Sequence, residues 1–171
     1  ARLSPRDPDT PAWDQETHQQ WQASRMEAYA AQVVSLDRGV GTILDTVRTS
    51  GVEDDTIVIF LSDNGASPEE IPHLDDFASR RDFYDPHTRD GREVRLGNTP
   101  DITPGHEDTY ASYGKPWANL SNTPFRLYKK WVHEGGIAAP FIMRWPGGGV
   151  RGRRIAHEPQ QLTNVVPTLL D

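Results

Sequence analysis

Apolar side chains recur at helical spacing between residues 17 and 50. The positions that repeat at steps of three or four are Met26, Tyr29, Ala30, Val33, Val40, Ile43, Leu44 and Val47. Residues at such steps lie on one face of a helix, so the pattern predicts an amphipathic helix. Gly39 and Gly41 weaken its middle, and either one long helix or two consecutive helices fit the pattern.

The next apolar stretch, TIVIFLS at residues 56–62, is short and unbroken. Such a run is typical of a strand covered on both faces, and a helix followed by a buried strand is the order found in α/β proteins. A second strand is predicted within IAAPFIMRWP, residues 137–146, where Pro140 favours an edge strand or a strand beginning. LTNVVPTLLD at residues 162–171 is typical of the first turns of another helix.

Little apolar periodicity remains between residues 67 and 124, which are rich in Gly, Pro, Asp and Arg. This stretch predicts a long irregular loop region, either functional or disordered. Residues 1–15 are rich in Pro, Asp and Arg and are interpreted as an irregular connector. A length of 171 residues predicts a single domain.

Composition and charge narrow the classes of function. Only 35% of the residues are hydrophobic, which is low for a self-contained domain and suggests core partners outside this chain. The net charge of -7, without a run of Lys or Arg, argues against a nucleic-acid partner. No apolar segment approaches the roughly 20 residues that span a bilayer. The opening ARLSPRDPDTPAW has no targeting pattern and is interpreted as the interior of a longer chain, so the compartment is not assigned.

Asp63 and Asn64 follow the predicted strand, in SDNGAS. Asn-Gly after an apolar run is a signal for a hairpin turn, but the residues that follow, SPEEIPHLDD, show no alternation. In open α/β sheets, ligands bind beyond the carboxyl ends of the strands, and carboxylate and carboxamide oxygens suit Ca²⁺ or Mg²⁺. Ca²⁺ takes about six to eight oxygen ligands, so a metal here needs others from outside this chain or from a substrate. A metal site and a plain loop both stay open at this point.

A second candidate stretch is KKWVHEGGI, residues 129–137. Gly135 and Gly136 allow the backbone to approach a ligand or another strand closely. Lys129 and Lys130 are by default solvated surface charges. An ammonium group beside a divalent cation is favourable only when an anion bridges the two charges, and a sulfate or phosphate ester is the natural bridge.

Three stretches together resemble one known family. They are YAAQVVSLDRGVGTILDTVRTSGVEDDTIVIFLSDNGAS, SYGKPWANLSNTPFRLYKKWVHEGGIAAPFIMRWPGG and LTNVVPTLLD, and each is similar to a segment of the sulfatases of the alkaline-phosphatase superfamily. The resemblance covers nearly the whole chain from about Trp21 onward. DNG alone is a weak motif. The strength of the resemblance lies in the order and spacing of the three stretches. It implies an α/β, alkaline-phosphatase-like fold with a mostly parallel central sheet flanked by helices, of which residues 1–171 form part of the catalytic domain.

The resemblance also implies roles by position. Asp63 and Asn64 match two of the family's Ca²⁺ ligands, with Mg²⁺ as the other candidate ion. Lys129, five residues before the Glu of the EGG motif, matches the lysine that contacts the sulfate oxygens, and it is expected to bind substrate and act in catalysis. Lys130 is its neighbour rather than its equivalent, and is expected to point elsewhere.

The chain lacks the family's nucleophile motif and one of its pairs of metal ligands. The family's nucleophile is a formylglycine made from the Cys or Ser of a C/S-x-P-S-R motif, which lies upstream together with an Asp-Asp metal pair. This sequence has no cysteine, and LSPR at residues 3–6 does not have that motif's order. The chain is therefore interpreted as an interior piece with half of the active site, expected to be inactive alone. The formylglycine is expected in the rest of the parent protein.

The activity implied for the parent is hydrolysis of a sulfate ester of a small molecule or a glycan. The expected partners are this substrate and the remainder of the parent chain. The alternative within the superfamily is a phosphomonoester or phosphodiester hydrolase, because the same metal and lysine serve phosphate. The alternative from another class is a non-catalytic, Ca²⁺-dependent binding piece.

Overall fold

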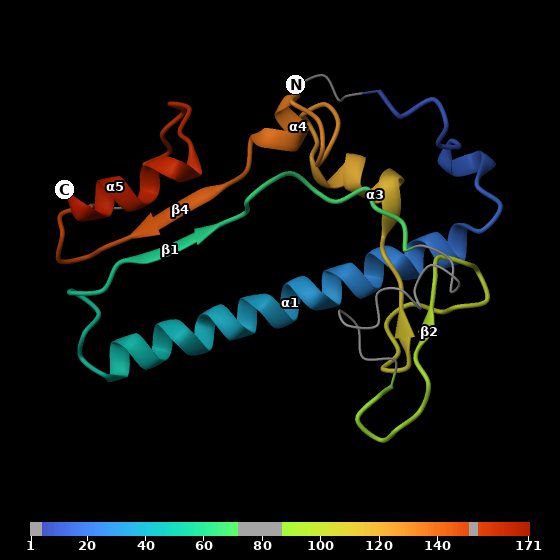
Figure 1. Ribbon diagram of the computed structural model, residues 1–171, viewed down its shortest axis with the longest axis horizontal. Helices are drawn as coiled ribbons and strands as arrows, with labels where there is room; N and C mark the ends of the chain where they lie inside the picture. The colour runs from blue at the N-terminus through green and yellow to red at the C-terminus, as the bar shows by residue number, and fades with distance from the viewer. Residues whose placement is uncertain (1–4, 72–86, 151–153) are drawn as a thin grey trace. The chain divides into compact units, whose positions relative to one another are not determined.

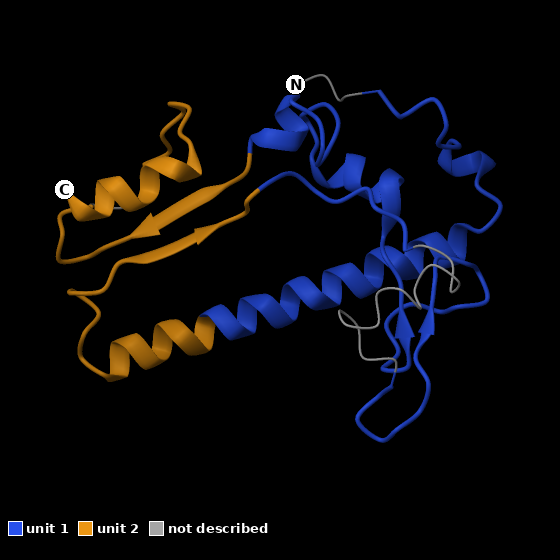
Figure 2. Cartoon of the chain, viewed as in Figure 1, with its two compact units in different colours: residues 1–40, 64–138 blue, residues 41–63, 139–171 orange. Residues whose placement is uncertain are grey.

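The computed structural model describes residues 5–71, 87–150 and 154–171. The chain forms two compact units, each assembled from two separate stretches of sequence (Figure 2). Unit 1 comprises Ala1–Val40 and Asn64–Ala138, and unit 2 comprises Gly41–Asp63 and Ala139–Asp171. The stretches of the two units alternate along the sequence, and no linker segment separates one unit from the other. The pattern of apolar and polar residues therefore does not reveal two units.

The longest element is the helix α1, Gln19–Thr49 (Figure 1). It confirms the helix predicted over residues 17–50 and shows that it is one continuous helix. Gly39 and Gly41 each cost about 1 kcal/mol relative to Ala, which does not break a helix of 31 residues. In the described part of the chain, no helix is both long enough and apolar enough to cross a lipid bilayer.

Unit 2 contains a two-stranded sheet made of β1, Val58–Leu61, and β4, Phe141–Arg144. Both predicted strands are thereby confirmed. β4 begins directly after Pro140, whose carbonyl accepts a hydrogen bond from the N–H of Ser62 (3.3 Å). Proline has no N–H to donate, so its position at the beginning of a strand costs no ladder bond.

β1 pairs with β4, which runs antiparallel to it, and the parallel neighbours implied by the family resemblance are not among the described strands paired with β1. An apolar run indicates how well a strand is covered, whereas its direction depends on the path of the chain between strands. Phe60 and Leu61 are also 38% and 36% exposed, so the described residues do not cover β1 on both faces. The mostly parallel central sheet stays a prediction for the complete protein.

Unit 2 ends in helical turns. A 3-10 helix, Leu162–Asn164, leads directly into α5, Val165–Leu170. Pro167 lies in the first turn of α5, where a backbone N–H would have no acceptor within the helix. The helix predicted within residues 162–171 is confirmed.

Unit 1 contains short elements joined by longer irregular segments. A 3-10 helix, Trp13–Gln15, precedes α1. The remaining elements in the described residues of unit 1 are β2, Arg95–Leu96, β3, Thr109–Tyr110, α3, Gly114–Ser121, and α4, Glu134–Ile137. β2 and β3 pair in parallel.

Three of these elements, β2, β3 and α3, lie within residues 67–124, where the sequence predicts an irregular loop region. Strands of two residues are too short to produce an alternating pattern. Gly114 and Pro116 are loop signals, yet both lie in the first turn of α3, where proline is tolerated. Residues 72–86 of the predicted loop region, and residues 1–4 of the predicted connector, lie outside the described residues.

Arg25 of α1 organises the packing of unit 1 and is only 4% exposed. Its guanidinium donates to the Glu70 carboxylate (2.8 Å) and to the Ser112 carbonyl (2.8 Å). It also lies over the Trp21 ring, 4.6 Å from the ring centroid. A buried charge is tolerated when it is paired and hydrogen-bonded, so this network fixes α1 to the segment that follows β1 and to the segment that leads into α3.

Candidate functional site

Asn64 and Lys129 belong to two stretches that lie against each other in unit 1. Residues 64–66 form the loop after β1, and residues 122–136 lead into and through α4. Three hydrogen bonds join them: Gly65 N–H to the Gly136 carbonyl (3.0 Å), Lys129 N–H to the Ala66 carbonyl (3.0 Å) and Ala66 N–H to the Asn122 side-chain oxygen (3.1 Å). The backbone of Lys129 is therefore bonded to the loop that begins with Asn64.

Gly65 makes this close approach sterically feasible, and Gly135 allows a second close approach within residues 122–136. A Cβ atom placed on Gly65 would lie 1.7 Å from the Gly135 carbonyl oxygen, and one on Gly135 would lie 1.9 Å from the Leu127 carbonyl oxygen. Both clashes are with backbone atoms, which cannot move aside as a side chain does. A close backbone approach at Gly135 is observed as predicted, but the neighbour is Leu127 in the same stretch rather than another strand.

We expect Gly135→Ala to destabilise the complete protein by at least about 2 kcal/mol, because inserted atoms in a packed site force backbone shifts. Gly39→Ala is the matched control, since in the described part of the chain no atom other than the adjoining backbone of α1 and the two neighbouring residues lies within 4 Å of the added Cβ. That change should stabilise by up to about 1 kcal/mol through helix propensity. Urea unfolding midpoints measure both effects, and equal midpoints for the two variants would contradict the packing described.

Asp63 and Asn64 lie two and three residues after the last residue of β1. Asp63 is exposed and Asn64 is half-buried. The boundary between the two units falls between them. Within the described residues, neither side chain is hydrogen-bonded or ion-paired, so their oxygen atoms are not engaged by that part of the chain.

The donor chemistry of Asp63 and Asn64 fits a hard divalent cation, because both offer oxygen atoms that have no competing partner among the residues the structure describes. Over residues 5–71, 87–150 and 154–171, no group of three or more His, Cys, Asp or Glu side chains gathers as a metal centre. A cation held by this pair therefore takes its remaining ligands from elsewhere.

Lys129 and Lys130 converge on a single carboxylate. The Lys129 ammonium lies 3.3 Å from Oε2 of Glu69, and the Lys130 ammonium lies 3.2 Å from Oε1 of the same side chain. The expectation that Lys130 points away from Lys129 is therefore wrong. Lys130 has a φ of 83°, in the left-handed region that is uncommon for residues other than glycine. In a regular strand or helix, the side chains of two consecutive residues point in different directions. The left-handed conformation of Lys130 departs from both, so this rule does not hold here.

Glu69 is a functional candidate that the sequence did not single out. The ammonium groups of Lys130 and, to a lesser extent, Lys129 hold the pKa of Glu69 below its usual value. The only signal in the sequence is a carboxylate shortly after DNG, and no spacing rule links it to a lysine pair sixty residues further along the chain. Its pairing appears only once the loop and the lysine segment are placed together.

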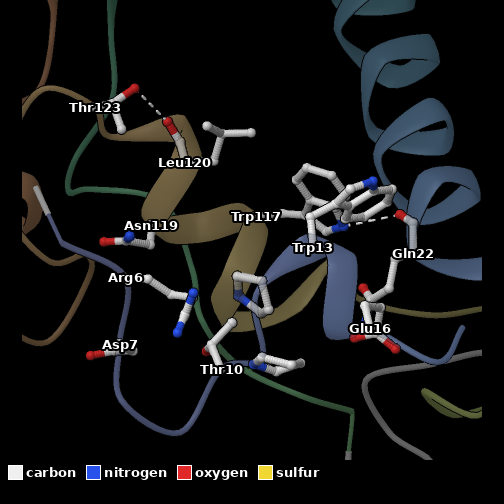
Figure 3. A pocket seen from close by; sticks show the side chains of 12 residues that line it. Arg6, Asp7, Thr10, Trp13, Glu16, Gln22, Trp117, Asn119, Leu120 and Thr123 are labelled. Atoms are coloured by element: carbon white, nitrogen blue, oxygen red, sulfur yellow. Dashed lines mark hydrogen bonds between the residues drawn. The ribbon is translucent and has the colours of Figure 1, made fainter. Parts of the chain in front are cut away.

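A cavity of about 320 Å³ lies between the connector and α3 (Figure 3). The rings of Trp13 and Trp117 form part of its wall, with centroids 5.8 Å apart. Trp117 is held by a hydrogen bond from its Nε1 to the Gln22 carbonyl (3.0 Å). None of the residues predicted for the site lines this cavity, so we do not assign the chemistry to it.

A second hollow, of about 620 Å³, is lined by Glu69 and Ser67 together with residues of α1 and of the segment around β3. Tyr29 and Tyr113 in its wall stack with centroids 4.7 Å apart. Through Glu69 this hollow borders the carboxylate that binds both lysines. It is therefore the hollow next to the candidate anion-binding groups.

Comparison with known proteins agrees with the family resemblance. Residues 3–171 match the family described as Sulfatase. An uncharacterized sulfatase of Schizosaccharomyces pombe is 34% identical over 167 residues, which are 95% of this chain and 27% of that protein. An arylsulfatase of Klebsiella aerogenes is 30% identical over 154 residues, 90% of this chain and 30% of that protein. A steryl-sulfatase of Mus musculus is 28% identical over 142 residues, 83% of this chain and 16% of that protein.

The chain spans less than a third of the length of these relatives. The match to the family nevertheless extends over all but the first two residues. It includes the loop after β1 and the lysine segment, which the hydrogen bonds of unit 1 join. The chain belongs to the sulfatase family.

Proposed function

We propose that the complete protein hydrolyses sulfate esters and that this chain supplies half of the active site. In this proposal, Asp63 and Asn64 are two ligands of a divalent cation, Ca²⁺ or alternatively Mg²⁺, and Lys129 contacts the sulfate group. The observation that carries the proposal is the hydrogen-bonded contact between the loop after β1 and the Lys129 segment in a member of this family. It supports the proposal because the Lys129 N–H donates to the carbonyl of Ala66, two residues after Asn64.

The chemistry of these groups suits a sulfate ester. A bound cation would supply positive charge that polarises the sulfate oxygens. The Lys129 ammonium would stabilise the negative charge that develops as the bond between sulfur and the leaving oxygen breaks. The nucleophile, a formylglycine, is proposed to lie in the remainder of the parent chain, because this sequence has neither a cysteine nor a C/S-x-P-S-R motif.

The proposed substrate class is a sulfate ester of a small molecule or a glycan. Two relatives are named for aryl and steryl sulfates, and those names support the ester class without selecting the organic group. Taken alone, the 171 residues are proposed to be inactive, since they supply only two oxygen ligands and no nucleophile.

The proposal is tested by comparing an aryl sulfate with the matching aryl phosphate as substrates of the complete protein. We expect faster turnover of the sulfate and loss of that turnover when a chelator removes the cation. Preference for the phosphate would instead identify a phosphomonoester or phosphodiester hydrolase. Ca²⁺-dependent retention of the ester without any turnover would identify a binding protein, and either result contradicts the proposed function.

A further inference from the structure

The Glu69 carboxylate lies where two lysines can hold an anion together. Each of its oxygens faces one ammonium group, Oε2 that of Lys129 and Oε1 that of Lys130. The two oxygens of a carboxylate are spaced much like two oxygens of a sulfate group. An arrangement that binds the first in this two-point manner therefore suits the second.

We propose that Lys129 and Lys130 form one anion-binding site, that Glu69 occupies it when no ester is bound, and that the sulfate group of the ester displaces Glu69. This inference rests on the proposed function and adds two residues to it. Lys130 becomes a second contact for the sulfate group, and Glu69 becomes an internal competitor for both lysines.

The exposure of the three side chains makes displacement feasible. The side chains of Glu69, Lys129 and Lys130 are 49%, 36% and 63% exposed. Ion pairs at such exposure contribute little free energy, because water solvates both charges and side-chain freedom is lost on pairing. Glu69 also borders the hollow of about 620 Å³, which offers the carboxylate room to leave the lysines.

The contacts of Glu69 differ from those of a carboxylate that holds the fold together. Its neighbour Glu70 binds the buried Arg25 and belongs to the packing of unit 1. Glu69 instead binds two partly exposed lysines and accepts a hydrogen bond from the Ser67 hydroxyl (3.2 Å) within its own loop. The lowered pKa of Glu69 keeps this side chain charged at neutral pH, so it competes as an anion.

The inference is tested by the affinity of the complete, Ca²⁺-loaded protein for inorganic sulfate, measured by titration calorimetry. Glu69→Gln removes the competing charge at nearly constant size. Lys130→Gly removes one ammonium, and glycine accepts the φ of 83° at this position. Glu107→Gln is the matched control, because Glu107 is an exposed carboxylate whose ion-pair partner is Arg92 (2.9 Å).

We expect Glu69→Gln to tighten sulfate binding and Lys130→Gly to weaken it, each by about threefold, the size of one exposed ion pair. Glu107→Gln should leave the affinity unchanged. In the Lys130→Gly background, the gain from Glu69→Gln should shrink, because one of the two released charges is already gone. Unchanged or weaker binding in Glu69→Gln, or unchanged binding in Lys130→Gly, would overturn the inference.

Failure of this inference can be told apart from failure of the proposed function. Binding of inorganic sulfate requires no turnover, whereas the proposed function is measured as ester hydrolysis by the unaltered protein. Hydrolysis combined with a sulfate affinity that ignores Glu69→Gln contradicts only the competing role of Glu69. A sulfate affinity that responds as expected, in a protein without hydrolysis, supports the anion site and contradicts only the proposed activity.

Discussion

Lys129→Ala in the complete protein is expected to slow hydrolysis of an aryl sulfate by about 10²–10³, the range for losing one preorganised charge-stabilising donor. The ammonium is proposed to act on charge that develops as the ester bond breaks. Its removal should therefore lower kcat as well as kcat/KM. Steady-state kinetics on an aryl sulfate, at constant Ca²⁺, measure both parameters.

Lys130→Gly provides the comparison for Lys129→Ala. It removes an identical charge from the next residue, and glycine keeps the left-handed backbone conformation. We expect an effect of only about threefold, because Lys130 is proposed to contribute one exposed ionic contact. Equal losses in the two variants, or a larger loss in Lys130→Gly, would show that the catalytic role does not belong to Lys129.

Asp63→Ala is expected to lower cation affinity and hydrolysis together. Loss of a group that merely supports a metal ligand costs about 10–100-fold in affinity, and Asp63 is proposed as a ligand itself, so we expect a loss at least that large. Removing the carboxylate leaves an open coordination position and uncompensated positive charge. Metal content of the purified variant and its turnover of an aryl sulfate measure the two effects.

Two further variants sharpen the test of Asp63. Asp63→Asn keeps an oxygen ligand and removes the charge, so its cation affinity should lie between those of the unaltered protein and Asp63→Ala. Asp45→Ala removes an exposed carboxylate that pairs with Arg48 (2.8 Å) and should change neither quantity. Unchanged metal content and rate in Asp63→Ala would contradict its role as a ligand.

The elements predicted best are those with the strongest local signals. α1 has a long helical repeat, and β1 and β4 have compact apolar runs, with Pro140 placed directly before β4. These signals arise within each segment, so the prediction of a helix or strand does not depend on what the segment packs against. The antiparallel pairing of β1 and β4 could not be predicted from local signals, because it depends on the path of the chain between the two strands.

The candidate site shows the same division between local and long-range information. Asp63, Asn64 and Lys129 were selected from the sequence through their place after a strand and through the family resemblance. Glu69 and the convergence of Lys130 were not, since they depend on a contact between segments distant in sequence and on one positive φ. Buried Arg25 is a further example, because a charged residue beside the apolar stripe of α1 gives no sign of its partner Glu70.

A crystal structure of the complete protein with Ca²⁺ and inorganic sulfate tests the central claim most directly. We expect the cation to be bonded to side-chain oxygens of Asp63 and Asn64 at about 2.3–2.6 Å, the usual range for Ca²⁺. We also expect the Lys129 ammonium to lie within hydrogen-bond distance of a sulfate oxygen on the same cation. A cation bound away from Asp63 and Asn64, or a sulfate without contact to Lys129, would contradict the claim that this chain supplies half of a sulfatase active site.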